Sequence, residues 1–163
     1  MRRIWVIATL QLLLILGCHQ RTSRMSVLTS QETSDAIEDL RAAYGAFDRG
    51  DIDAAVRMLA PDVDWTEPVE FPGGGNFHGI EGVKKYLSQS RAGAAEMISV
   101  PEQFIPAGRR IVVFVHSRVL PKGGASWQDL RLADVYTFKA DKVVAMHAFA
   151  DRKAALRSVG VDD

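Results

Sequence analysis

The chain has 163 residues, enough for one domain with a buried core, and its 47% hydrophobic and 25% charged residues are typical of a globular protein. Its formal net charge is zero and its Lys and Arg residues are scattered, so we expect no nucleic-acid partner. The single cysteine excludes an internal disulfide framework.

Residues 1–17 have the features of a secretory signal peptide. Two arginines follow Met1, and the apolar run at 4–16 is too short for a comfortable transmembrane helix. The residues Ile15-Leu-Gly-Cys18 resemble the lipobox of bacterial lipoproteins, in which the cysteine is lipidated after cleavage. We therefore predict a lipid anchor on Cys18, which would be the only membrane contact, a flexible tether at 18–33, and a location in the bacterial cell envelope. The alternative is translation from Met25, which would leave the protein cytoplasmic.

Three amphipathic helices are expected before the main run of strands. Asp35, with Glu38 three residues later, resembles a capping box and predicts the first helix start. Gly50 suits the end of that helix, and the second helix must stop before Pro61. Apolar residues at helical spacing predict a third helix at 80–90.

Strands are predicted at 63–67 and then, in succession, at 96–105, 109–120, 126–138 and 142–150. A glycine-rich loop is expected at 70–76 and a short helix at 151–160. The long strands are apolar on both faces, so both faces of the sheet must be buried against other elements. We expect the helices on one face and a second copy of the chain on the other, which predicts a homodimer through the outer sheet face.

Asp134 is the unusual residue of the 126–138 strand. The two-residue period of a strand puts it on one face with Leu130, Leu132, Tyr136 and Phe138. A buried carboxylate without partners is so costly that it is normally paired or protonated. Asp134 is therefore either held by a structural hydrogen bond or part of a binding pocket.

Five short segments in this order resemble the superfamily of SnoaL-like proteins, ketosteroid isomerases and nuclear transport factor two. They are Tyr44–Asp51, Asp64–Pro68, Phe77–Val83, Asp134–Phe138 and Phe149–Asp151. The resemblance implies an α+β fold at 34–160. In that fold, a cone-shaped, curved antiparallel sheet wraps on three N-terminal helices as a cystatin-like α+β barrel and encloses an apolar pocket.

The resemblance also implies roles for two acids. The catalytic base of the steroid isomerases lies before a proline at the end of the first strand, where this chain has Glu67 and Pro68. Their second acid resembles Asp134 in position. By analogy with that isomerase, Glu67 would be the base, and Asp134 would stay neutral and donate a hydrogen bond to the developing oxyanion. The plain alternative for Glu67 is a salt bridge at the strand end.

The chain departs from the isomerase pattern at several positions. The tyrosine that stabilises the oxyanion maps to Ala43, and Tyr44 is displaced by one residue, about 100° around a helix. Leu59 and Leu87 stand where supporting tyrosines are expected. These departures argue against steroid isomerisation itself.

The remaining candidates are four aromatic residues, one methionine and one histidine. We predict that the pocket is lined by Tyr44, Phe47, Trp65, His78, Tyr136 and Met146. No histidine or acid has zinc-ligand spacing, so no metal and no cofactor are predicted.

Two functions remain open. One is proton transfer of the isomerase, cyclase or hydrolase type on a small apolar carbonyl or polyketide-like compound. The other is a non-catalytic, membrane-tethered module that binds a ligand or a protein.

Overall fold

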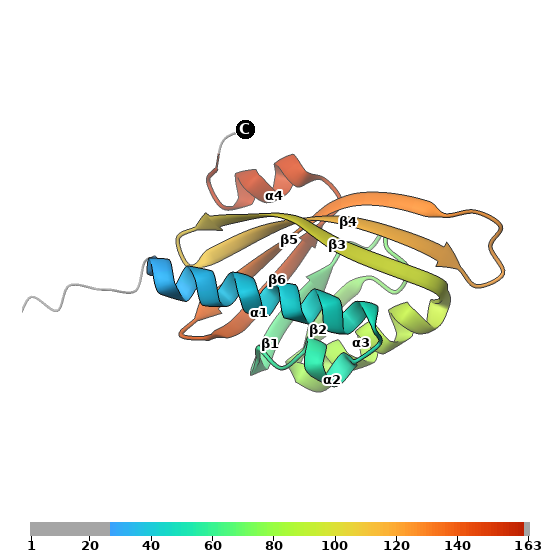
Figure 1. Cartoon of the computed structure of the whole chain (residues 1–163), viewed down its shortest axis with the longest axis horizontal. Helices are drawn as coiled ribbons and strands as arrows, with labels where there is room; N and C mark the ends of the chain where they lie inside the picture. The colour runs from blue at the N-terminus through green and yellow to red at the C-terminus, as the bar shows by residue number, and fades with distance from the viewer. Residues whose placement is uncertain (1–26, 162–163) are drawn as a thin grey trace, which may run out of the picture.

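The computed structural model describes residues 27–161, which form an α+β fold around one sheet (Figure 1). The elements in chain order are α1 Ser30–Asp48, α2 Ile52–Ala55, β1 Leu59–Glu67, β2 Gly75–His78, α3 Gly79–Gly93, β3 Ala94–Ala107, β4 Arg110–Pro121, β5 Gln128–Lys139, β6 Lys142–Phe149 and α4 Arg152–Ser158.

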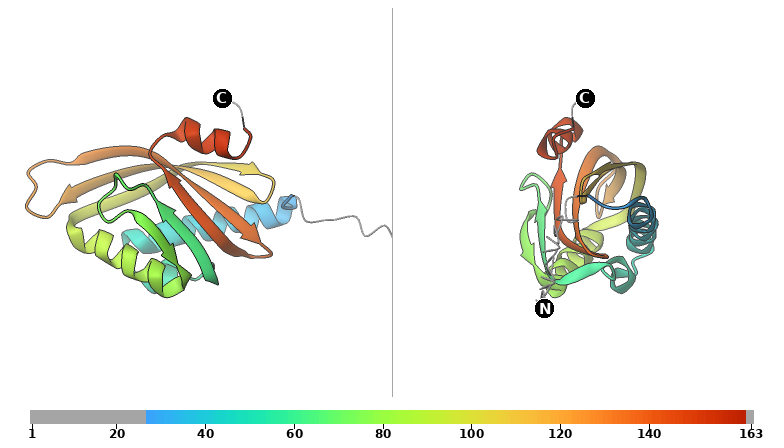
Figure 2. Two further views of the ribbon diagram at one scale, coloured as in Figure 1. Left: turned by 180° about the vertical axis from the view of Figure 1, so that it is seen from behind. Right: turned by 90° about the vertical axis from the view of Figure 1, so that its left-hand side faces the viewer.

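The six strands lie in the order β2-β1-β6-β5-β4-β3. All neighbours are antiparallel except β1 and β6, which pair in parallel. The sheet is therefore mixed, and the prediction of a purely antiparallel sheet was wrong on this point. Register shifts occur in β3 and in the β5–β6 pair, and such irregularities bend strands. The curved sheet partly surrounds the space in front of α1 (Figure 2).

Helix α1 begins at Ser30, earlier than the start expected at Asp35. Thr29 caps it: the Glu32 backbone N–H donates to the Thr29 hydroxyl at 3.2 Å, and the Glu32 carboxylate accepts from the Thr29 N–H at 2.8 Å. This is a complete capping box, and it outcompetes the weaker pattern that begins at Asp35. Leu28 is also buried, so the fold starts before the boundary predicted at 34, and the last residues of the predicted tether belong to it.

The helices lie where two helices before β1, one before β3 and one after β6 were expected, and the element that was not expected is β2. Within residues 27–161 there are four helices, and β1 and β2 separate α3 from α2. Helix α2 is only four residues long, and the chain enters β1 at Leu59. The segment expected to be a loop at 70–76 closes with a turn, and β2 begins at Gly75.

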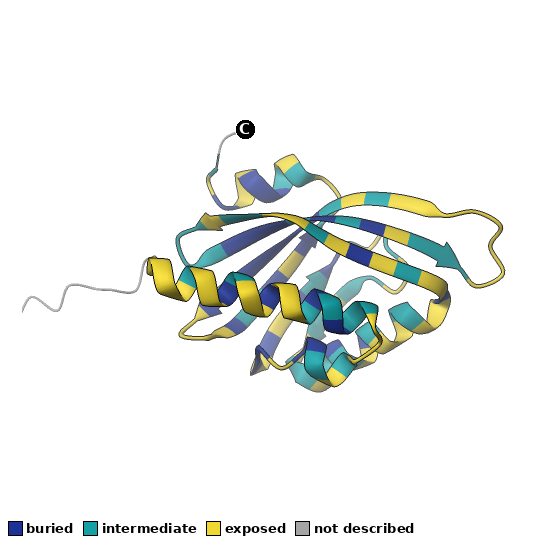
Figure 3. Ribbon diagram, viewed as in Figure 1, coloured by how far each residue is buried: buried dark blue, intermediate teal, exposed yellow. Residues whose placement is uncertain are grey.

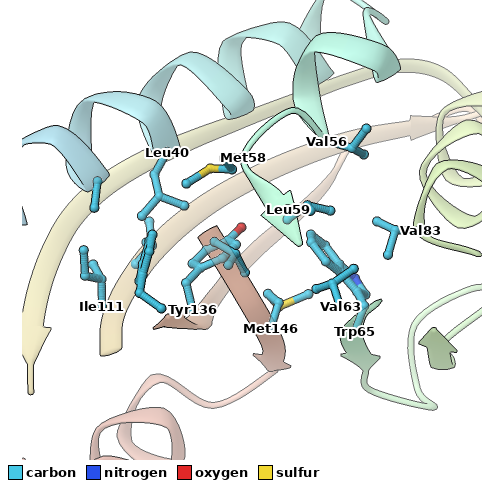
Figure 4. Close-up of a cluster of buried hydrophobic side chains, with 14 of the residues drawn as sticks. Leu40, Val56, Met58, Leu59, Val63, Trp65, Val83, Ile111, Tyr136 and Met146 are labelled. Atoms are coloured by element: carbon cyan, nitrogen blue, oxygen red, sulfur yellow. The ribbon is translucent and has the colours of Figure 1, made fainter. Parts of the chain in front are cut away.

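The main core lies between the concave sheet face and the helices that precede β3. Its fully buried members include Leu40 of α1, Val63 of β1, Val83 of α3 and Ile111 of β4 (Figure 4). Alternate residues of β4 point in opposite directions, so Val112 belongs to a second cluster on the outer face.

Helix α4 covers part of that outer face. Its buried residues Ala155 and Leu156 pack in the cluster that contains Val112, Ala133 and Val135. Figure 1 shows α4 on the side of the sheet away from α1, and Figure 3 shows buried positions along its length. Part of the cover that the sequence analysis assigned to a second subunit therefore comes from the chain itself.

Candidate functional site

A cavity of about 590 Å³ lies between the concave sheet face and helices α1 and α3. Its lining is mainly apolar and comes from α1, β1, α3, β3, β4 and β5. The exposed lining residues mark its mouth, and they are Pro72, Gly73, Gln89, Gly93 and Gln128. Two carboxyl groups, those of Glu67 and Asp134, open into the same cavity.

Asp134 faces the cavity, as the strand period predicted. Leu130, Leu132 and Tyr136 of β5 line the cavity with it, and Asp134 is only 8% exposed. The Tyr44 hydroxyl donates to Asp134 Oδ2 at 2.5 Å, and the Tyr136 hydroxyl donates to the Tyr44 oxygen at 3.1 Å. Burial raises the pKa of Asp134 to about 6, although the hydrogen bond from Tyr44 opposes the rise.

Glu67 is the last residue of β1 and is 9% exposed. The Trp65 indole N–H donates to its Oε1 at 2.7 Å. Burial, and then the negative charge of Asp134, raise the pKa of Glu67 to about 8, against the opposing effects of Trp65 and Tyr86. At neutral pH the pair therefore holds one proton chiefly on Glu67 and one negative charge chiefly on Asp134.

The tyrosines of the site remain protonated. Burial, followed by the charge of Asp134, raises the pKa of both Tyr44 and Tyr136 well above the ordinary value for tyrosine. Tyr44 reaches Asp134 even though the sequence analysis placed it about 100° away from the isomerase position. The packing of α1 against the sheet brings the Tyr44 hydroxyl to this acid.

Tyr86 was missed by the sequence analysis. It is buried on α3, lines the cavity and interacts with Glu67. Burial first, and then the charge of Glu67, raise its pKa. The signal was its spacing of three residues from Val83, which puts both residues on one helical face.

The other predicted lining residues divide into two groups. Phe47 and Trp65 line the cavity together with Tyr44 and Tyr136. Met146 does not, because its partners across the sheet are Trp65 and Tyr136 and it is buried in the core beside them (Figure 4). His78 also lies outside the cavity: its side chain is 73% exposed and pairs with Asp64 at 2.8 Å. Neither of these two residues lines this cavity.

No group of three metal-ligating side chains lies together within residues 27–161. In the same part of the chain, no helix is both long enough and apolar enough to cross a membrane. Cys18, the predicted lipidation site, lies outside the described residues.

The curved mixed sheet and the helices on its concave face define a protein of the nuclear-transport-factor-two-like fold. The sequence matches the model of the SnoaL-like domain over residues 40–146, and the chain belongs to that family. No curated protein matches the chain.

Several solved structures are similar to this chain. One is an NTF2-like protein of unknown function from Burkholderia pseudomallei, at 30% identity and a TM-score of 0.65, with 78% of this chain and 98% of that chain covered. Another is TerC crystallised with polyporic acid, at 27% identity and a TM-score of 0.65, with 77% and 97% covered. A protein with a ketosteroid-isomerase-like fold from Catenulispora acidiphila, in complex with trimethylamine, is 14% identical with a TM-score of 0.64, over 76% and 93% of the two chains. This last likeness shows the fold alone.

Proposed function

We propose that the protein binds a small apolar compound with a carbonyl or phenol oxygen and transfers a proton on it. The observation that carries this proposal is the acid pair: two buried carboxyl groups open into one apolar cavity, where burial raises the pKa of Glu67 to about 8 and that of Asp134 to about 6. Acids whose environments separate their pKa values are suited to acid and base roles.

The pKa values favour the reverse of the roles that the resemblance implied. The carboxyl of Asp134, with a pKa of about 6, ionises before that of Glu67, with a pKa of about 8, so we assign Asp134 as the base. Glu67 accepts the Trp65 N–H on Oε1, which leaves Oε2 to carry a proton. The Asp134 carboxylate would take a proton from the carbon next to a carbonyl, and the C–H electron pair would form the enol double bond. Glu67 would meanwhile donate to the carbonyl oxygen.

The ligand class follows from the lining. The cavity offers aromatic and aliphatic walls, and its described lining contains no Lys, Arg or His. An anionic compound would meet no cation there, so we propose an uncharged apolar molecule or a weakly acidic phenol. The complex of TerC with polyporic acid makes that compound the first probe to test, in a buffer acidic enough to keep its quinone hydroxyl groups protonated.

Binding without turnover is the second candidate. The Tyr44 hydroxyl proton is committed to Asp134 and that of Tyr136 to Tyr44, so neither tyrosine has its proton free for a ligand oxygen. A site with one remaining strong donor can hold a ligand oxygen and still stabilise a developing negative charge poorly.

The two candidates are separated by measuring exchange of the α-protons of 2-tetralone in D2O by NMR. The catalytic proposal expects wild-type protein to accelerate exchange above buffer, and it expects Asp134→Asn to abolish the acceleration. Glu67→Gln should retain part of it, because an amide still donates a hydrogen bond. Polyporic acid binding, measured by calorimetry on the same proteins, reports the pocket independently. Binding without exchange supports the second candidate, and the absence of both refutes the proposed function.

A further inference from the structure

Two serine hydroxyls stand in the wall of the cavity, away from the acid pair. Ser99 of β3 and Ser117 of β4 are opposite each other in the strand register and both line the cavity. Their oxygens lie 3.2 Å apart, and they are 8% and 6% exposed. They are thus polar side chains buried in a mainly apolar wall.

Their neighbours on the same strand faces are apolar. Met97 precedes Ser99 by two residues, and Val115 and Val119 flank Ser117 at the same spacing. A buried hydroxyl is more costly than a methyl group of similar size unless it forms hydrogen bonds. The contact between the serines uses one of their two O–H groups as donor and leaves the other O–H and several lone pairs for another partner.

The serine pair lies at a defined distance from the acid pair. Ser117 pairs with Leu130, which precedes Asp134 by four residues on β5 and points to the same side. Four residues of strand correspond to about 13 Å. Along that length, Leu130 and Leu132 and the facing aromatic residues supply apolar wall.

We infer that Ser99 and Ser117 form a second polar subsite, which binds an uncharged carbonyl or hydroxyl oxygen at the far end of an elongated apolar ligand. The inference rests on the proposed function, because the near end of that ligand carries the oxygen that meets Glu67 and Asp134. The preferred compound is then a rigid molecule of two or more rings with an oxygen at each end. Compounds with a charged far end are disfavoured, because the described lining offers no cation and no acid besides Glu67 and Asp134.

The test compares two probes that differ only at the far end, trans-4-hydroxystilbene and trans-4,4′-dihydroxystilbene. Their dissociation constants are measured by fluorescence titration, and polyporic acid serves as a third ligand. In wild-type protein the second hydroxyl should tighten binding about three- to tenfold, the effect of one neutral hydrogen bond. The gain should disappear in the double variant Ser99→Ala/Ser117→Ala, while the affinity for the monohydroxy probe stays the same.

Two further variants control for folding and for the hydroxyl itself. Ser117→Thr keeps a hydroxyl in the subsite and should keep most of the gain. Ser126→Ala changes an exposed serine between β4 and β5 and should change nothing. Circular dichroism and the urea midpoint establish that each variant is folded. If the double variant is unfolded, the comparison of Ser117→Ala with Ser117→Thr decides.

The outcomes separate this inference from the proposed function. A gain that survives the double variant, or no gain in wild-type protein that does bind the monohydroxy probe, overturns the serine subsite alone. Binding of polyporic acid but of neither stilbene also overturns it, because the distance argument then fails. If no probe binds, the proposed function fails and the subsite with it.

Discussion

Replacing Glu67 by glutamine should make the protein more stable at alkaline pH and leave it nearly unchanged at acid pH. Glutamine resembles the protonated acid in shape and can still accept the Trp65 N–H through its carbonyl oxygen. The pKa of Glu67 is raised from 4.5 to about 8 in the folded protein. Between these values the folded state binds more protons than the unfolded chain, so the stability of the wild type falls as pH rises.

The size of the effect follows from the same two pKa values. Each pKa unit corresponds to about 1.4 kcal/mol, so ionising Glu67 in the fold costs roughly 4–5 kcal/mol once the pH is above 8. The penalty is absent below about pH 4.5, where the carboxyl is neutral in both states. A typical domain has about 5–15 kcal/mol of total stability, so the difference is large enough to measure.

The assay is urea unfolding of wild type and Glu67→Gln at intervals from pH 4 to pH 9. The free energy of unfolding of the variant should exceed that of the wild type by an amount that grows with pH and levels off near pH 9. Glu70→Gln, in the exposed loop that follows, is the matched control and should show no such growth. A constant or shrinking difference would mean that Glu67 is not held protonated by burial.

Four further predictions concern single residues. Tyr44→Phe removes the donor to Asp134 and should raise the pKa of that carboxyl by about 1–2 units, measured by carbon-13 NMR; an unchanged pKa would contradict the assigned hydrogen bond. His78→Ala should leave polyporic acid affinity within about twofold, since the side chain lies outside the cavity, and a larger loss would reinstate it as a ligand residue. If the N-terminal segment directs lipidation, Cys18→Ser should abolish palmitate labelling and release the protein from the membrane fraction, whereas unchanged fractionation would refute the anchor. Val100, on the outer face of β3, is 49% exposed, so Val100→Lys should dissociate a homodimer formed through that face. If sedimentation velocity shows the same species for wild type and variant, the homodimer does not use this face.

The positions that sequence reasoning placed correctly depend on local periodicity. The two-residue strand period alone determines that Asp134 lies on the face of Leu130, Leu132 and Tyr136, and all four line the cavity. The pocket role of Glu67 came from the resemblance to the steroid isomerases, whose base lies before a proline at the end of the first strand. For Asp134 the relevant geometry is contained within a few neighbouring residues.

What sequence reasoning left unpredicted depends on how distant elements meet. Tyr44 reaches Asp134 through the packing of α1, 90 residues away in the chain, and helical spacing alone does not predict that packing. Met146 follows the strand period correctly, yet it lies beside Trp65 in the core because β6 pairs in parallel with β1. The parallel pairing joins the first strand to the last, and no local pattern indicates it.

The exchange of roles between the two acids has the same origin. Burial raises the pKa of both carboxyl groups, so desolvation by itself does not decide which of them is ionised at neutral pH. Each carboxyl group also accepts hydrogen bonds that favour its ionised form, Asp134 from Tyr44 and Glu67 from Trp65 and Tyr86, and the negative charge of Asp134 disfavours a second charge on Glu67. An acid can therefore be recognised from its strand, but its role as donor or base depends on groups that other elements bring to it.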